Sequence, residues 1–360
     1  MTKKILFSLY AMVIVVMAVA TIVCQMHGQD FANANIYLSW WFSALWAVMA
    51  AFGVYYFLKR KIRKYSVIAL HLAFVLILIG AFVTHITGIQ GVLHLRNGET
   101  TNRFVSTEST SNGKVLSLPF SVTLKSFDVK YKKGTMDPLD YRSVFVINGE
   151  KEGQISMNNI YTIQGYRLYQ RGFDDDMEGS YISVNSDPYG IAITYTGYAL
   201  LALSFIAIML RNSQRRLFFY SLPLTIFIGY LFSLKDYNIP VLNTWILPIH
   251  VSMIVSAYVL LLVSIGVRKM LPIALGLLSM GIFLGAIWAN ISWGNYWGWD
   301  PKEVWALITL MIYAIPVHSA TFPAFQSKKF YRTYMIIAFL AVLMTYFGVN
   351  LFLSGMHSYA

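Results

Sequence analysis

The sequence predicts an α-helical polytopic membrane protein of about nine transmembrane helices, with one mainly-β extracytoplasmic domain inserted between helices 3 and 4. Three observations predict this class. The 360 residues are 57% hydrophobic and only 12% charged, whereas soluble domains are about 45–50% apolar and about 25% charged. Long apolar runs recur along most of the chain. One central stretch instead alternates polar and apolar side chains. An ordinary soluble globule is therefore excluded.

The apolar runs define the predicted membrane crossings. Each is close to the length of about 20 residues that spans a bilayer core. The first run follows Lys3 and Lys4, but it is longer than the apolar part of a typical signal peptide, and no clear small-x-small cleavage site follows it. We therefore interpret it as a helix. The nine runs are 5–24, 38–58, 66–86, 189–210, 217–234, 249–267, 271–291, 303–321 and 333–353.

Basic residues beside these runs predict the orientation. Alternating crossings bring fifteen of the 28 basic residues to one side, with no acidic residue beside them. The positive-inside rule then places the N-terminus in the cytoplasm and the C-terminus outside. This topology explains the net charge of +12 without a nucleic-acid partner. The fifteen residues are Lys3, Lys4, Lys59, Arg60, Lys61, Arg63, Lys64, Arg211, Arg215, Arg216, Arg268, Lys269, Lys328, Lys329 and Arg332.

The alternating stretch, residues 87–188, predicts a β domain. Polar and apolar residues alternate through 120–124, and Asn97-Gly98 and Asn148-Gly149 are turn signals. Its role is either that of a rigid spacer or that of a binding module. The chain then divides into membrane helices (1–86), the β domain (87–188) and a C-terminal helix bundle (189–360). Its single cysteine, Cys24, excludes an intramolecular disulfide and a cysteine-based zinc site.

Histidines at matched depths suggest two pairs. An ionisable side chain in a membrane is costly and usually marks a functional site. His71 and His318 both lie near the cytoplasmic ends of their predicted helices, so they could face each other. His250 opens the sixth crossing from outside, and His357 follows the last. The alternative interpretations are hydrogen bonding to a neighbouring helix for the first pair and ordinary interfacial histidines for the second.

A dense tryptophan cluster lies between His250 and His357. Segment 293–305, WGNYWGWDPKEVW, holds four of the nine tryptophans. An aromatic belt at the membrane interface is the alternative, but it does not explain this density with glycines between the rings. Asp300, Pro301 and Glu303 are typical N-cap, N1 and N3 residues of a helix. A glycine-interrupted aromatic surface between histidines suits a flat apolar macrocycle that carries a metal, and imidazole is a common ligand of haem iron.

This segment closely resembles the tryptophan-rich WWD motif of the haem-handling superfamily. With LPIHVSM around His250 and GMHSY around His357, the C-terminal part resembles the CcsA branch of that superfamily. The N-terminal part resembles the ResB/CcsB partner of CcsA through LHLAFVLILIGAF, NGETTNRF and YRLYQRGFDDDMEGSYISVNSDPYG. The whole chain thus resembles a compact natural fusion of the two, a system II cytochrome c synthase of the fused ResB/CcsB–CcsA type.

The resemblance implies a function and a set of site residues. It implies transport of haem b across the bacterial cytoplasmic (inner) membrane and thioether attachment of this haem to CxxCH motifs of apocytochrome c outside, a holocytochrome c synthase (haem-lyase) activity. Thiol-reducing partner proteins would keep the client cysteines reduced. His71 and His318 match the transmembrane ligands of haem iron, and His250 and His357 the external, catalytic pair. The expected haem-binding residues of the segment are Trp293, Tyr296, Trp297, Trp299, Asp300 and Trp305.

Two other functions remain open, and several residues stay unassigned. A haem exporter or chaperone would use the same residues and pass its haem to a separate synthase. A di-haem electron-transfer subunit would also pair histidines, but it would have no tryptophan-rich external loop. We interpret Asp300 and Glu303 as capping residues rather than as an acid–base pair. The external domain is short for the family, and Cys24, His27, His85 and His94 match no family residue.

Overall fold

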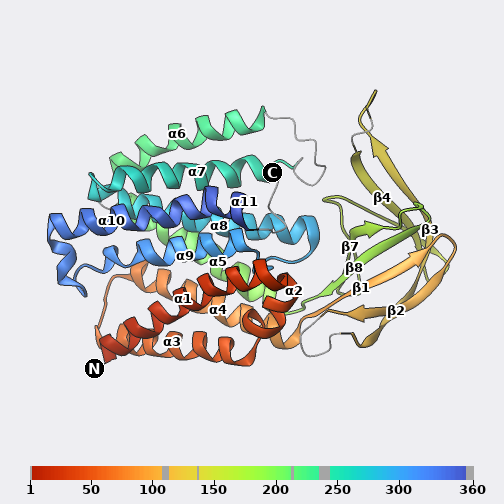
Figure 1. The fold of residues 1–360 in the computed structure, drawn as a ribbon, viewed down its shortest axis with the longest axis horizontal. Coiled ribbons are helices and arrows are strands. Elements are labelled where there is room, and N and C mark those ends of the chain that lie inside the picture. Colours follow the sequence, from red (N-terminus) through yellow and green to blue (C-terminus); the bar gives the residue numbers. More distant parts are fainter. Residues whose placement is uncertain (1, 108–112, 136–137, 212–214, 235–243, 354–360) are drawn as a thin grey trace.

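The computed structural model describes residues 2–107, 113–135, 138–211, 215–234 and 244–353. It consists of a helix bundle with a β-sheet domain at one end (Figure 1). Within these residues, eight helices are long and apolar enough to cross a membrane. A helical membrane protein with a central β region was expected, and the structure confirms both parts. The eight helices are Lys3–His27, Trp40–Lys59, Tyr65–Thr87, Gly190–Leu210, Arg215–Ser233, Ile246–Ser264, Arg268–Trp293 and Lys328–Phe352.

The predicted crossing at 303–321 differs from the expectation. Helix α9 spans only Pro301–Ala314, 14 residues, or about 21 Å at 1.5 Å per residue. Two short 3₁₀ turns follow it, η4 (Pro316–His318) and η5 (Pro323–Gln326). Pro316 has no backbone N–H with which to continue the helix. Eight rather than nine of the described helices therefore reach the length of a membrane span.

The remaining helices follow the predicted order. The expected boundaries move by a few residues, because helix ends depend on capping contacts that hydropathy does not report. The long helices are α1 (Thr2–His27), α3 (Trp40–Lys59), α4 (Tyr65–Thr87), α5 (Gly190–Arg211), α6 (Arg215–Ser233), α7 (Ile246–Ser264), α8 (Leu271–Trp293) and α10 (Lys328–Leu343). The short ones are α2 (Gln29–Ala32), η1 (Asn33–Tyr37), η3 (Arg268–Met270), η6 (Met344–Gly348) and α11 (Val349–Phe352).

Helices α4 and α5, which precede and follow the inserted domain in the sequence, pack closely against each other. A Cβ atom at Gly80 would lie 2.2 Å from Oγ1 of Thr194, and one at Gly190 would lie 2.0 Å from Oγ1 of Thr84. Small residues let membrane helices approach in this way. The chain therefore leaves the bundle and re-enters it at neighbouring points.

The β domain is one eight-stranded antiparallel sheet in the order β5-β4-β3-β2-β1-β8-β7-β6. Along β3, every second residue from Leu118 to Leu124 is buried, which confirms the alternating pattern. Asn148 and Gly149 both have positive φ (53° and 74°), as a tight hairpin turn requires. The strands are β1 (Ile89–Arg96), β2 (Thr100–Ser106), β3 (Val115–Tyr131), β4 (Pro138–Ile147), β5 (Lys151–Ser156), β6 (Tyr161–Ile163), β7 (Tyr166–Phe173) and β8 (Gly179–Ser186).

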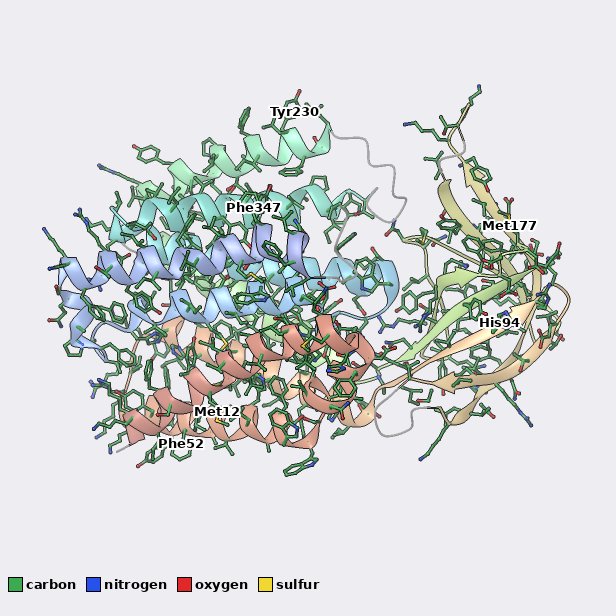
Figure 2. The ribbon with its side chains drawn as sticks, in the orientation of Figure 1. Met12, Phe52, His94, Met177, Tyr230 and Phe347 are labelled. Atoms are coloured by element: carbon green, nitrogen blue, oxygen red, sulfur yellow. The ribbon has the colours of Figure 1, made fainter. Side chains whose placement is uncertain are left out.

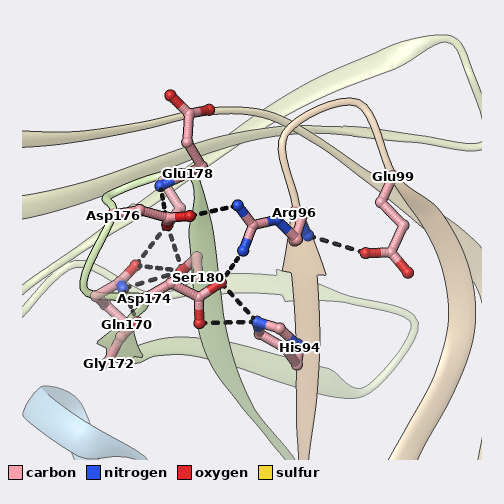
Figure 3. A network of polar contacts seen from close by, with 10 residues as sticks. His94, Arg96, Glu99, Gln170, Gly172, Asp174, Asp176, Glu178 and Ser180 are labelled. Atoms are coloured by element: carbon pink, nitrogen blue, oxygen red, sulfur yellow. Dashed lines mark hydrogen bonds and ion pairs between the residues drawn. The ribbon is translucent and has the colours of Figure 1, made fainter.

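A polar network ties the loop after β7 to β1. His94 Nε2 lies 3.0 Å from Asp174 Oδ2, and Arg96 forms ion pairs with Asp174 (3.2 Å) and Asp176 (2.5 Å) (Figure 3). His94 lies in the part of the sheet remote from the helices (Figure 2). His94, one of the three histidines that match no family residue, thus belongs to a contact between β1 and the loop that follows β7.

Basic residues from three segments meet at the end of the bundle opposite the sheet. Lys3 Nζ donates to the carbonyl of Thr321, and Arg60 Nη2 lies 3.5 Å from Oγ1 of the same residue. Arg268 Nη1 donates to the carbonyl of Phe325 at 2.6 Å. All three therefore contact the connection between α9 and α10. Their gathering at one end agrees with the expected one-sided distribution of basic residues.

Candidate functional site

The structure brings His71 and His318 together. Their ring centroids are 6.1 Å apart and their planes are nearly perpendicular (88°). His71 is half-buried on α4 and also packs against Phe57 of α3, at 4.6 Å between centroids. His318 is exposed in η4, at the end of the bundle where the basic residues lie. The matched depth expected from sequence is therefore realised as a contact.

Hydrogen bonds fix the same ring tautomer in three histidines. Nδ1 lies 2.8 Å from the carbonyl oxygen of Val67 in His71, 2.9 Å from that of Ala314 in His318, and 2.8 Å from that of Gly281 in His250. A carbonyl oxygen can only accept, so Nδ1 carries the proton in each neutral ring. Nε2 then carries the lone pair, which is the form that binds a metal ion.

His250 packs against two glycines of α8. Its Nδ1 bonds the carbonyl of Gly281, and a Cβ atom at Gly285 would lie 2.5 Å from its Cε1. The absence of a side chain at Gly285 therefore makes room for the imidazole ring. His357, its predicted partner, lies outside the described residues. The external pair remains a prediction for that reason.

The turn into α9 is capped as the sequence predicts. Asp300 Oδ1 accepts from the backbone N–H of Lys302 at 2.9 Å, and Glu303 Oε2 accepts from that of Asp300 at 3.3 Å. Glu303 also accepts from the N–H of Gly298 at 2.9 Å. This capping box satisfies N–H groups that the first helical turn would leave unpaired. Both carboxylates thus hold the turn in shape.

The tryptophans do not form one flat surface. Trp293 packs edge-on against Trp288, 4.9 Å between centroids, beside the first turn of α7. Trp297 and Trp299 are nearly perpendicular, at 87°, and Trp305 Nε1 donates to Thr21 of α1 at 3.2 Å. The backbone reverses at Gly294 (φ 83°) and again at Trp299 (φ 58°). These reversals divide the expected aromatic surface into a group beside α7 and a group beside α1.

The N-terminal helices hold the second group. The ring of Tyr37 stacks on Trp299 at 4.8 Å with an angle of 8°, and Phe42 packs edge-on against the same indole at 5.4 Å. Gln29 Nε2 donates to the carbonyl of Trp299 at 3.1 Å, while its Oε1 accepts from the Sγ of Cys24 at 3.1 Å. One face of Trp299 is therefore covered. The sequence does not predict these partners, because no local pattern marks them.

The β domain holds the other end of the turn. Asn185 Nδ2 donates to the carbonyl of Gly294 at 2.9 Å, and a Cβ atom at Gly294 would lie 2.0 Å from the ring of Tyr169. Burial raises the pKa of the Tyr169 hydroxyl above its ordinary value, so this group stays neutral. Tyr296 donates to Thr84 Oγ1 at 2.9 Å. The tryptophan-rich turn is therefore anchored to the sheet, to α4 and to the N-terminal helices.

Comparison with known proteins identifies two adjoining regions. Residues 58–196 match the ResB-like family, and residues 191–357 match the family described as Cytochrome C assembly protein. Together they run from the end of α3 to the last predicted histidine.

Curated relatives are similar over shorter stretches. Protein NrfI from Wolinella succinogenes is 47% identical over 90 residues, 25% of this chain and 10% of NrfI. Cytochrome c biogenesis protein CcsA is 46% identical over 91 residues in Oryza sativa and 45% identical over 91 in Marchantia polymorpha, in each case 25% of this chain and 28% of CcsA. The chain thus spans less than a third of these relatives' length.

These matches confirm the resemblance that rested on the WWD segment and on the residues around His71, His250 and His357. They also fit the membrane character of the bundle. The chain is a multi-pass membrane protein of cytochrome c biogenesis, and it belongs to the fused type that joins a ResB-like region to a CcsA-like region.

Proposed function

We propose that this protein moves haem b across the cytoplasmic membrane and attaches it by thioether bonds to CxxCH motifs of apocytochrome c. The pair of His71 and His318 carries the transport part of the proposal. A metal–imidazole bond is about 2 Å long, so two imidazoles on opposite sides of one iron have centroids roughly 6 Å apart. The observed separation is 6.1 Å, and both rings have Nε2 as the unprotonated nitrogen.

The basic end of the bundle then faces the cytoplasm. Lys3, Arg60 and Arg268 gather there, and the positive-inside rule assigns such an end to the cytoplasmic side. The sheet and the tryptophan-rich turn accordingly lie outside, and α9 with its 3₁₀ turns completes a ninth crossing. Haem would enter beside His71 and His318 and leave beside His250 and His357.

The attachment step places few chemical demands on this chain. Each client thiol adds across one haem vinyl group: the sulfur bonds one vinyl carbon and a proton goes to the other, so the addition is redox-neutral. The only cysteine here is Cys24, which is buried, so both thiols come from the client. Partner proteins would keep these client thiols reduced. The synthase contributes position. His250 and His357 would hold the iron until the client histidine replaces one of them.

Substitution of the first histidine pair tests the transport part. In His71→Gly and His318→Gly variants we expect co-purifying haem to fall and cytochrome maturation to stop, because an iron ligand is lost. Added imidazole should restore part of both by filling the vacant ligand position. His27→Gly is the matched control, since His27 is exposed and packs on Phe31. Unchanged haem and maturation in the His71→Gly/His318→Gly double variant would contradict the proposal.

The external site is tested by comparing two kinds of variant. Substituting His250 or His357 with Gly should block attachment while part of the haem is retained by aromatic contacts. Trp297→Ala should instead loosen haem, because stacking area is lost while both ligands remain. The haem-to-protein ratio and the thioether-linked product are measured in the same strain. Normal haem and product in Trp297→Ala, with failure only in the histidine variants, would make the tryptophans an interfacial belt.

The same strains separate ligation from export alone. Covalent haem on a co-expressed CxxCH protein, made when this chain is the sole synthase, supports attachment. Haem that reaches the outer side without any covalent product would instead identify an exporter.

Because neutral imidazole is the ligating form and the ordinary pKa of histidine is about 6.5, haem binding should weaken as the pH falls toward about 5.

A further inference from the structure

We propose that Arg167 is a positioning residue of the external haem site, through which the β domain fixes the tryptophan-rich turn. This inference rests on the proposed function, since it concerns haem held at that turn. Arg167 lies on β7 and bridges the two parts of the molecule. Its Nη1 donates to Oδ1 of Asn290 on α8 at 2.8 Å, and its Nη2 donates to Oδ1 of Asn185 on β8 at 2.9 Å.

Both of these bonds set the orientation of a buried amide. Asn185 and Asn290 are only 7% and 6% exposed, so water does not readily replace a lost partner. With Oδ1 of Asn185 turned toward the guanidinium, its Nδ2 points to the carbonyl of Gly294. In Asn290 the same orientation points Nδ2 to the hydroxyl of Tyr195 on α5, at 2.7 Å. Arg167 therefore decides which end of each amide faces the membrane helices.

The choice of arginine follows from this geometry. Guanidinium has donors arranged in a rigid fork, whereas the ammonium of lysine is a single point. Among the described residues, the hydrogen-bond partners of Arg167 are neutral amide oxygens, and none of the ion pairs includes it. An ordinary structural ion pair does not account for the residue. A bridge between two amides on different elements does.

The position of the tryptophans is the consequence. Gly294 is the residue at which the chain reverses after α8, with φ 83°; Trp293 directly precedes it and Tyr296 follows two residues later. Its carbonyl is held by Asn185, and the ring of Tyr169 lies against its Cα. If Asn185 turns over, the carbonyl loses its donor and the reversal is free to shift. The β domain thus acts on the haem site through Arg167, beyond serving as a spacer.

Two variants at Arg167 and one control test this role. Arg167→Gln removes the charge and the fork, and Arg167→Lys keeps only the charge. Arg171→Gln is the matched control, because Arg171 lies four residues further along β7 and is exposed. In full-length protein with haem bound, we measure the absorption spectrum, the reduction potential and the rate of thioether formation.

We expect both Arg167 variants to accumulate normally, to shift the spectrum and potential of bound haem, and to lower attachment about tenfold, the effect of losing one charge-assisted hydrogen bond. Arg171→Gln should change none of these. Wild-type spectrum, potential and attachment rate in Arg167→Lys would show that charge alone matters and would overturn the proposed bridging role of the guanidinium. An unchanged spectrum and potential in Arg167→Gln would overturn the positioning role.

A second measurement needs no haem. In a Cys24→Ser background, Asn295→Cys places a thiol one residue after Gly294, and its rate of maleimide labelling reports how firmly the turn is held. Arg167→Gln should raise this rate about tenfold, and Arg171→Gln should not. If the wild-type chain binds no haem, the proposed function fails, yet the labelling rates still decide whether Arg167 positions the turn. Equal rates in all three proteins would refute it.

Discussion

Gly294 carries two constraints at a single position, one from its own backbone conformation and one from a side chain of the β domain. Its φ of 83° lies in the left-handed region, which costs other residues about 1–2 kcal/mol. A Cβ atom would also lie 2.0 Å from Cε2 of Tyr169, a side chain that is 1% exposed. Overlap with a buried ring adds roughly 1–3 kcal/mol. No other residue type therefore suits this reversal.

We predict that Gly294→Ala lowers the midpoint of thermal unfolding and loosens bound haem. Gly53→Ala is the control: Gly53 lies in α3, where an added Cβ atom would meet no described atom within 4 Å, and alanine is favoured over glycine in a helix by about 1 kcal/mol. The measurement is the thermal midpoint of both variants in detergent. A Gly294→Ala protein as stable as Gly53→Ala would show that the turn tolerates a side chain.

At the scale of elements, the loop between β7 and β8 depends on charge. Arg96 hydrogen-bonds Asp176 and lowers the pKa of that carboxyl below the ordinary Asp value (Figure 3). A lowered folded-state pKa means that the contact contributes fully above the unfolded pKa, about 3.9, and is lost as pH falls through the lower, folded value. The clamp of this loop on β1 is therefore sensitive to acid.

We predict that amide hydrogens of residues 174–179 exchange faster once the pH falls below about 3.9, after correction for the intrinsic pH dependence of exchange. Arg96→Gln should raise their exchange already at neutral pH and remove the acid-dependent step. Hydrogen exchange followed by mass spectrometry of the intact chain measures both. An acid-dependent step of the same size in Arg96→Gln would assign the transition to another group.

Elements also show what could be predicted from sequence. The capping box of α9 needs only Asp300 and Glu303, three residues apart, so the local pattern predicts it correctly. The length predicted for the same helix is too long, because hydropathy counts the apolar residues beyond Pro316, whereas this proline lacks the N–H group that would continue the helical hydrogen bonds there.

The partners of the tryptophan-rich turn lay beyond sequence reasoning for a different reason. Asn185 contacts Gly294 across 109 residues, and Gln29 contacts Trp299 across 270. Such contacts follow from packing of the whole fold, and one sequence carries no periodicity that marks them. His71 and His318 are also far apart in sequence, yet their expected depths in the membrane place them at one level, and their rings lie near each other; their binding of iron stays a prediction.

At the scale of the whole molecule, charge and architecture predict one orientation. Lys3, Arg60 and Arg268 all contact the α9–α10 connection, at the end opposite the sheet (Figure 1). We therefore predict that a reporter fused after Ala360 is active only outside the cytoplasm, and that one inserted at Arg63 is active only inside. Activity of a cytoplasmic reporter at Ala360 would contradict both the sidedness and the ninth crossing.

The first and last strands of the inserted domain lie side by side, so changes in the length or sequence of the domain need not disturb the helices that flank it. Strand β1 pairs with β8 along its whole length, from Ile89 with Ser186 to Arg96 with Gly179, so the inserted domain begins and ends at the same place. Its outer portion can grow, shrink or be exchanged without moving α4 or α5. Among the described residues, Arg167, Tyr169 and Asn185 bind the base of the domain to the bundle. The outer part of the domain can therefore vary while the contacts at its base stay the same.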